Sequence, residues 1–184
     1  MAKVVVVFHS GYGHTLRLAQ AVADGAQAQL LAIDADGKLP DGGWALLAAA
    51  DAIIFGSPTY MGSVSWQFKK FADASSKPWY VQAWKDKLAA GFTTSSGLNG
   101  DKQLTLNTLY ALAMQHAMVW VSQGLKPSSV KASTRQDINN LASYSGAMAQ
   151  SPADAGADQM AAGDLETGRA FGQRVAELAT RFLG

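Results

Sequence analysis

The stretch Val4-Val5-Val6-Val7-Phe8, followed directly by His9-Ser10-Gly11-Tyr12-Gly13-His14-Thr15, decides the fold class of this chain. An unbroken apolar run rich in valine predicts a strand that is buried on both faces, as in a parallel sheet. A helical pattern begins at Thr15, so the glycine-containing segment lies between a strand and a helix. Such a turn leaves backbone N–H groups free at the positive end of the helix dipole, where an anion binds. The stretch therefore predicts an α/β fold with an anion site beside its first strand.

The alternation of short apolar runs with helical patterns continues along the chain. We expect strands at 4–8, 30–33, 52–55, 88–93 and 118–121, and helices at 15–28, 44–47, 64–74 and 102–115. A final helix is expected after 162, with Asp164 as its cap. This order predicts βαβ units. We expect a flavodoxin-like doubly wound parallel sheet of five strands in the order 2-1-3-4-5, with helices on both faces and a single domain over 1–184.

Residues 122–162 interrupt this pattern, because they are rich in Ser, Ala, Gly, Asn and Gln and show little periodicity. Loops of this length inside a compact domain are usually functional or mobile. A well-patterned helix follows, so we expect the stretch to pass over the ligand-binding edge of the sheet rather than to link two domains.

Composition excludes several classes of function. The net charge of the 184 residues is +1, so no strong attraction to nucleic acid or to an acidic membrane is expected. Cysteine is absent, which excludes disulfides and thiol catalysis. The three histidines are not spaced as metal ligands, and we predict no metal site. No leader precedes the first strand and no apolar run approaches the roughly 20 residues of a membrane span, so we expect a cytoplasmic protein.

Two further loops follow expected strands. The first is Gly56-Ser57-Pro58-Thr59-Tyr60-Met61-Gly62-Ser63, and the second is Thr93-Thr94-Ser95-Ser96-Gly97-Leu98-Asn99-Gly100. In an open α/β sheet, a ligand lies outside the carboxyl ends of the strands. The 56–63 loop can hold backbone amides and an aromatic side chain against a flat polar ring, and the 93–100 loop offers hydroxyls. Each loop alone is equally well explained as a turn, but the loops together predict one small-molecule pocket.

The first loop fits more than one motif. Gly11 and Gly13 match the first two positions of the dinucleotide fingerprint G-x-G-x-x-G, and Asp34 stands where a ribose-binding acid would lie. However, Leu16 replaces the third glycine of that fingerprint. A P-loop is excluded because no G-K-[ST] follows. The loop contains no Lys or Arg, so neutral donors would hold a phosphate there. From this loop alone, a dinucleotide site, another anion site and an ordinary turn remain open.

The three loops together resemble the flavodoxin superfamily and, within it, the tryptophan-repressor-binding-protein family of NAD(P)H:quinone oxidoreductases. The first loop is similar to that family's S-x-Y-G-H-x phosphate loop, the second to its G-T-P-T-R-F-G-N pattern and the third to its S-S-T-G run. The segment 115–119 is similar to the family's H-H-G-M-x-V segment, which places a histidine beside the flavin. Looser likeness at 142–147 and in the final helix extends the resemblance over nearly the whole chain.

The resemblance implies FMN as cofactor, NADH or NADPH as electron donor and a quinone-like acceptor. It also implies a homo-oligomer, dimer or tetramer, whose sites are completed by neighbouring chains. The positions that match the family's motifs imply cofactor contacts from the phosphate loop (Ser10, Tyr12, Gly13, His14, Thr15), from the second loop (Pro58, Thr59, Tyr60, Met61, Gly62) and from the third (Thr94, Ser95, Ser96, Gly97, Gly100). Catalytic roles are implied for His116, Trp79 and Tyr60.

The chain departs from the family at Tyr60, where the family carries an arginine that would assist a pyridine nucleotide. Two alternatives therefore stay open: a flavodoxin-like electron carrier, and an FMN-binding interaction protein without turnover of its own. The net charge of +1 speaks against the carrier, because electron-shuttle flavodoxins are strongly acidic. On the residues alone, His116 is typical of a core position, and Trp79 and its aromatic neighbours are typical of a core or an interface.

Overall fold

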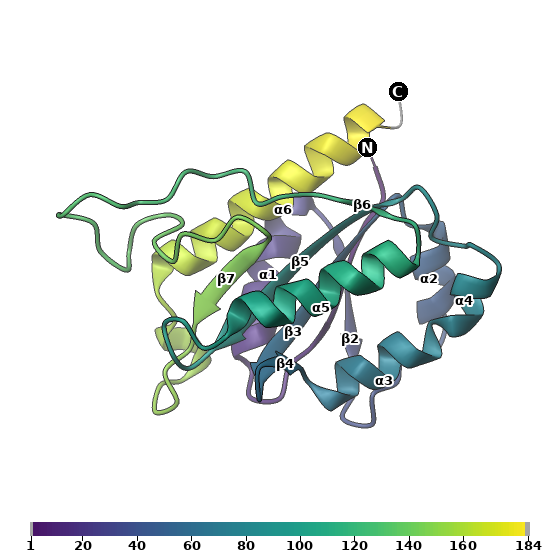
Figure 1. Cartoon of the computed structure of the whole chain (residues 1–184), viewed down its shortest axis with the longest axis horizontal. Coiled ribbons are helices and arrows are strands. Elements are labelled where there is room, and N and C mark those ends of the chain that lie inside the picture. Colours follow the sequence, from purple (N-terminus) through teal and green to yellow (C-terminus); the bar gives the residue numbers. More distant parts are fainter. Residues whose placement is uncertain (1, 183–184) are drawn as a thin grey trace.

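A parallel sheet forms the centre of the computed structural model, which describes residues 2–182 (Figure 1). Its main strands lie in the order β2 (Gln29–Ile33), β1 (Val4–His9), β3 (Ala52–Tyr60), β5 (Leu88–Ser95) and β6 (Val119–Trp120). Two short strands lie off this path: β4 (Ser63–Val64) pairs antiparallel with β3, and β7 (Ala147–Gln150) pairs parallel with β5. Counted without the hairpin strand β4, the main order is the predicted 2-1-3-4-5, and the doubly wound α/β fold is confirmed.

Helices cover both faces of the sheet (Figure 1). One face carries α1 (His14–Ala26) and α6 (Ala162–Phe182), and the other carries α2 (Gly43–Ala49), α3 (Trp66–Ala74) and α5 (Lys102–Gln115). A short helix that the sequence did not predict, α4 (Ser76–Tyr80), follows α3. Every residue of β1 is buried, with Val4, Val6 and Phe8 in the core under α1 and α6 and the intervening valines in the opposite core. This alternation explains the continuous apolar run.

The fifth position of the sheet is shared by two separate segments. β6 pairs only with Leu88 and Ala89, whereas β7 pairs with Phe92–Ser95 further along β5. Between them, residues 121–146 leave the sheet as a long irregular excursion that extends beyond the helices in Figure 1. The stretch 122–162, which we expected to form one long loop, contains two short elements, β7 and a 3-10 turn, Ala157–Gln159. β7 has the sequence Ala-Met-Ala-Gln, without β-branched residues, and propensity could not reveal it.

The second loop begins later than expected. β3 continues through Gly56 and Pro58 to Tyr60, then turns through Met61 and Gly62, at φ +49° and +75°, into β4. Two central residues with positive φ are typical of a tight hairpin turn between twisted strands. Glycine and proline normally argue against a strand interior, which explains the error. Gly56 is required here because a Cβ atom would lie 2.1 Å from the ring of Phe92.

Asp164 does not cap the last helix. α6 begins at Ala162, so Asp164 lies in its first turn, where its buried carboxylate accepts hydrogen bonds from Arg135 Nη2 and from the Gln150 backbone N–H. Burial raises the pKa of Asp164, and those two hydrogen bonds oppose the rise. The residue instead ties the 121–146 excursion, β7 and α6 together. Over residues 2–182, none of the helices combines the length and the apolar character that crossing a membrane requires.

Candidate FMN site

A cavity of about 500 Å³ lies at the carboxyl edge of the sheet. Ligand pockets for small molecules and cofactors span about 300–1,000 Å³, so the volume suits a mononucleotide. Its walls come from the start of α1, the carboxyl ends of β3 and β5, and the segment after β7. The lining residues are Tyr12, His14, Thr15, Pro58, Thr59, Tyr60, Thr94, Ser95, Ser96, Ser151, Ala153, Ala155 and Gly156. None of these is Lys, Arg, Asp or Glu, so the walls combine hydroxyl groups with apolar and aromatic surface.

The first loop prepares the start of α1 for an anion. Ser10 Oγ accepts hydrogen bonds from the backbone N–H groups of Gly13 and Leu16, both at 3.1 Å. Gly13 has φ +91°, a left-handed conformation that glycine adopts without strain. Within the part of the chain that the structure describes, the N–H groups of His14 and Thr15 have no acceptor. These two donors at the positive end of a helix dipole, beside the cavity, fit a phosphate group.

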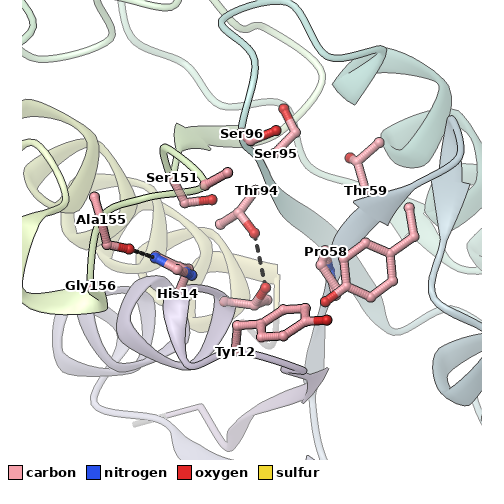
Figure 2. Close-up of a pocket in the computed structure, with 13 residues that line it drawn as sticks. Tyr12, His14, Pro58, Thr59, Thr94, Ser95, Ser96, Ser151, Ala155 and Gly156 are labelled. Atoms are coloured by element: carbon pink, nitrogen blue, oxygen red, sulfur yellow. Dashed lines mark hydrogen bonds between the residues drawn. The ribbon is translucent and has the colours of Figure 1, made fainter.

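Two side-chain contacts join the walls of the cavity (Figure 2). The hydroxyls of Thr15 and Thr94 lie 2.9 Å apart, which links the start of α1 to the end of β5. His14 Nε2 lies 2.8 Å from the carbonyl oxygen of Ala155, which links α1 to the segment after β7. The cavity is therefore closed by contacts between segments far apart in the sequence, and its shape is set before a ligand arrives.

A chain of hydroxyl groups fixes Thr59 on the side of the cavity formed by β3. Thr105 Oγ1 donates to Thr59 Oγ1 at 2.8 Å, and Thr59 Oγ1 lies 2.8 Å from Thr93 Oγ1. Thr93 Oγ1 in turn donates to the Ser57 carbonyl oxygen at 2.7 Å. Because each hydroxyl has a partner, Thr59 is held in one orientation, as a specific contact to a polar ring edge requires.

Two tyrosines stand at the cavity and carry aromatic surface. The rings of Tyr12 and Tyr60 meet edge to face with centroids 6.5 Å apart, and Tyr12 is 82% exposed. A Cβ atom on Gly11 would lie 2.5 Å from the Tyr60 hydroxyl oxygen, so glycine leaves room for this arrangement. Burial, and then the neighbouring Tyr12, raise the pKa of Tyr60, so its phenol keeps its proton and can donate a hydrogen bond. An aromatic wall of this kind suits a flat molecule.

The structure brings together nine of the residues predicted to bind a cofactor: Tyr12, His14, Thr15, Pro58, Thr59, Tyr60, Thr94, Ser95 and Ser96. The remaining predicted residues, Ser10, Gly13, Met61, Gly62, Gly97 and Gly100, do not line the cavity. Ser10 and the glycines shape the backbone beside it, whereas the Met61 side chain is fully exposed.

Four lining residues lie in the segment Ser151–Gly156, from which no site residue was predicted. The sequence Ser-Pro-Ala-Asp-Ala-Gly is rich in turn formers, and it belongs to the stretch expected to pass over the ligand edge. That expectation is confirmed for 151–156 only, and the individual contacts could not be assigned from composition.

Trp79 and His116 lie outside the cavity of their own chain. Trp79 is 49% exposed on α4, and His116 is buried directly after α5. His116 Nε2 lies 2.8 Å from Ser75 Oγ, and the imidazole packs on the ring of Trp84 with centroids 4.1 Å apart. His116 Nδ1 has no hydrogen-bond partner among residues 2–182. We therefore interpret His116 as a histidine of the core in this chain.

The buried His116 makes the stability of the fold sensitive to acid. Burial lowers its pKa from 6.5 to about 4, so the folded protein keeps a neutral imidazole where the unfolded chain takes up a proton. We expect the free energy of unfolding to fall by up to about 3 kcal/mol as the pH drops from about 6.5 to about 4. Urea unfolding over this pH range measures the change. A His116→Gln variant should lose most of the slope and keep the smaller part from His9, whose pKa burial also lowers; an unchanged slope contradicts the assignment.

Asp34, the acidic residue that a dinucleotide site would need, has a structural role in the fold. Asp34 Oδ1 accepts hydrogen bonds from the backbone N–H groups of Asp36, at 2.9 Å, and Lys38, at 2.8 Å, and does not line the cavity. Asp34 therefore builds a turn after β2. The lining of the cavity therefore contains no acidic residue for the ribose of a dinucleotide.

A doubly wound parallel sheet with a cavity at its carboxyl edge defines the chain as a flavodoxin-like protein. Residues 44–128 match the family model for NADPH-dependent FMN reductase. The chain is 56% identical to "Flavodoxin FldP" of Pseudomonas aeruginosa, over 97% of both chains. It is 31% identical to an "NAD(P)H dehydrogenase (quinone)" of Archaeoglobus fulgidus, over 98% of this chain and 99% of the relative.

Among solved structures, a flavodoxin, WrbA-like protein from Agrobacterium tumefaciens is 54% identical, with a TM-score of 0.83, over 98% of this chain and 99% of the other. The chain thus belongs to the flavodoxin-like family of the WrbA type, as the resemblance of its loops implied.

Proposed function

We propose that this protein is an FMN-dependent oxidoreductase that transfers electrons from NADH or NADPH to a quinone-like acceptor. The observation that carries the proposal is the neutral cavity, with free helix N–H groups at one side and two tyrosines at another. The relative named as a quinone dehydrogenase supports the acceptor class. Bound FMN would supply the electron-pair transfer, and the protein supplies orientation and electrostatics.

Different residues of the cavity would bind different parts of FMN. The N–H groups of His14 and Thr15 would hold the phosphate, and the fixed hydroxyls of Thr59 and Thr94 would face the ring system. The protonated Tyr60 hydroxyl could donate to an oxygen of a flat acceptor. The proposal includes a cytoplasmic homo-oligomer, in which the exposed Trp79 would lie against a neighbouring chain.

An anaerobic titration tests the electron donor. FMN-loaded protein is mixed stepwise with NADPH or NADH, and a quinone is added afterwards. We expect either nucleotide to abolish the absorbance of the oxidised flavin and the quinone to restore it, with sustained turnover in the steady state. A Tyr60→Phe variant keeps the aromatic ring and removes the hydroxyl, so it should bind FMN normally and turn over quinone more slowly. Flavin that binds but is reduced by neither nucleotide contradicts the proposal.

An electron carrier is the second candidate, and two observations favour it. The 56% identical relative is named a flavodoxin, and the lining of the cavity contains no Lys or Arg for the pyrophosphate of a nucleotide. The same titration separates the two functions, because a carrier's flavin would be reduced only after a reductase protein is added. The net charge of +1 provides little of the acidic surface that such carriers use for docking.

A further inference from the structure

Lys102, the first residue of α5, is buried behind the turn that follows β5. Only 1% of its surface is exposed, although lysine is rarely buried in proteins. Its ammonium group donates three hydrogen bonds, to Ser95 Oγ at 2.7 Å, to the Gly97 carbonyl oxygen at 2.7 Å and to the Leu98 carbonyl oxygen at 2.8 Å. All three acceptors are uncharged oxygens of the 95–98 turn.

No carboxylate lies within ion-pair distance of the Lys102 ammonium in the described range 2–182. The charged groups that act on it from farther away are Asp164 and Arg135, which bind each other. Burial lowers the pKa of Lys102 to about 8, with Asp164 opposing and Arg135 adding to this shift. Burying a cation without an anion is unfavourable, so the fold keeps this charge at a cost to its own stability.

The position of this charge relates it to the cavity. Ser95, which accepts from Lys102, also lines the cavity, together with Ser96. The turn is compact: a Cβ atom on Gly100 would lie 2.2 Å from Ser95 Oγ, and Gly100 has φ +54°. On its other side the turn is held by Gln150 Nε2, which donates to the Ser96 carbonyl oxygen at 3.1 Å. One ammonium group thus binds three oxygen atoms of the turn, and one of these belongs to Ser95, which lines the cavity.

We propose that Lys102 is a positioning residue for the flavin, whose ammonium group holds the 95–98 turn in place and supplies a positive potential that favours the reduced ring over the oxidised one. A reduced flavin carries more electron density than an oxidised one, and a nearby positive charge in a site of low dielectric stabilises it. The inference rests on the proposed FMN site. The ligand class in this inference is a redox-active ring that gains negative charge on reduction.

The test compares Lys102→Gln and Lys102→Met with Lys102→Arg, and with Lys77→Met as a control, because Lys77 is exposed on α4. The dissociation constant of oxidised FMN and the two-electron midpoint potential are measured for each protein. Proteolysis of the FMN-free proteins reports on the 95–98 turn. We expect the two uncharged variants to lose about tenfold more affinity for reduced than for oxidised FMN, which is a midpoint potential about 30 mV more negative. Arginine should preserve the potential, and the Lys77 variant should match the wild type.

The outcomes separate the two parts of the inference. Lys102→Gln with the wild-type potential overturns the electrostatic part, and Lys102→Met with wild-type resistance to proteolysis overturns the positioning part. If Lys102→Met does not fold, Lys102→Gln, which keeps a hydrogen-bond donor, carries both measurements. Wild-type protein that takes up no FMN contradicts the proposed function instead, and the proteolysis comparison still decides whether Lys102 holds the turn.

Discussion

Replacing Thr15 with aspartate should lower the affinity for FMN by about a hundredfold or more, which corresponds to about 2.7 kcal/mol. The new carboxylate would lie in the first turn of α1. There it would accept hydrogen bonds from the free N–H groups that, in our proposal, bind the phosphate. It would also place a negative charge beside the phosphate, and like charges in a partly desolvated site repel by several kcal/mol. Titration of the FMN-free protein, followed by flavin fluorescence, measures the loss.

Two controls separate this effect from damage to the fold. Thr15→Val removes only the hydroxyl that contacts Thr94 at 2.9 Å, so it should weaken the binding of FMN by about 1 kcal/mol. Riboflavin lacks the phosphate, so its weaker binding should differ little between wild type and Thr15→Asp. Position 15 is buried, but an aspartate there lies in the first turn of a helix, where acidic residues are favourable, and circular dichroism checks that the variant folds. If Thr15→Asp binds FMN as the wild type does, the phosphate lies elsewhere.

Much of the fold could be predicted from local pattern. The run Val4–Phe8 identified the first strand because a doubly covered parallel strand needs apolar residues on both faces. The helix at 102–115 has the bounds predicted from its sequence. The site was predictable in outline because strand order alone brings the carboxyl ends of β1, β3 and β5 to one edge. These features depend on a few neighbouring residues or on the order of the strands, and both can be inferred from the sequence.

The parts that could not be predicted depend on contacts between distant segments. β7 is a strand because β5 offers it backbone partners, and Pro58 lies within β3 because it pairs alongside Thr94. Nothing in the sequence distinguishes Lys102 from other lysines, and only the folded turn at 95–98 shows that it is buried. For His116, the residues alone favour a core position and the family resemblance implies a catalytic one, and only the fold shows that Trp84 and Ser75 surround it.

Replacing Gly172 with alanine should destabilise the protein by about 3 kcal/mol, because α1 and α6 touch through their backbones at this point. A Cβ atom on Gly172 would lie 1.9 Å from the Val22 carbonyl oxygen, and one on Gly25 would lie 1.8 Å from the Arg169 carbonyl oxygen. A backbone carbonyl inside a helix cannot rotate away, so the helices would have to separate. That separation would loosen the packing of both helices on the sheet, next to β1, which leads into the loop at 10–13.

Gly168→Ala is the matched control, since it makes the same change on the same helix. Its Cβ atom would meet the end of the Leu18 side chain at 2.7 Å, and that side chain can change rotamer. Alanine also gains up to about 1 kcal/mol over glycine in helix propensity, so this variant should stay within about 1 kcal/mol of the wild type. Urea unfolding followed by circular dichroism measures both variants. A Gly172→Ala midpoint equal to that of Gly168→Ala would show that the helix pair can shift, and the close backbone contact would then contribute nothing to the choice of glycine.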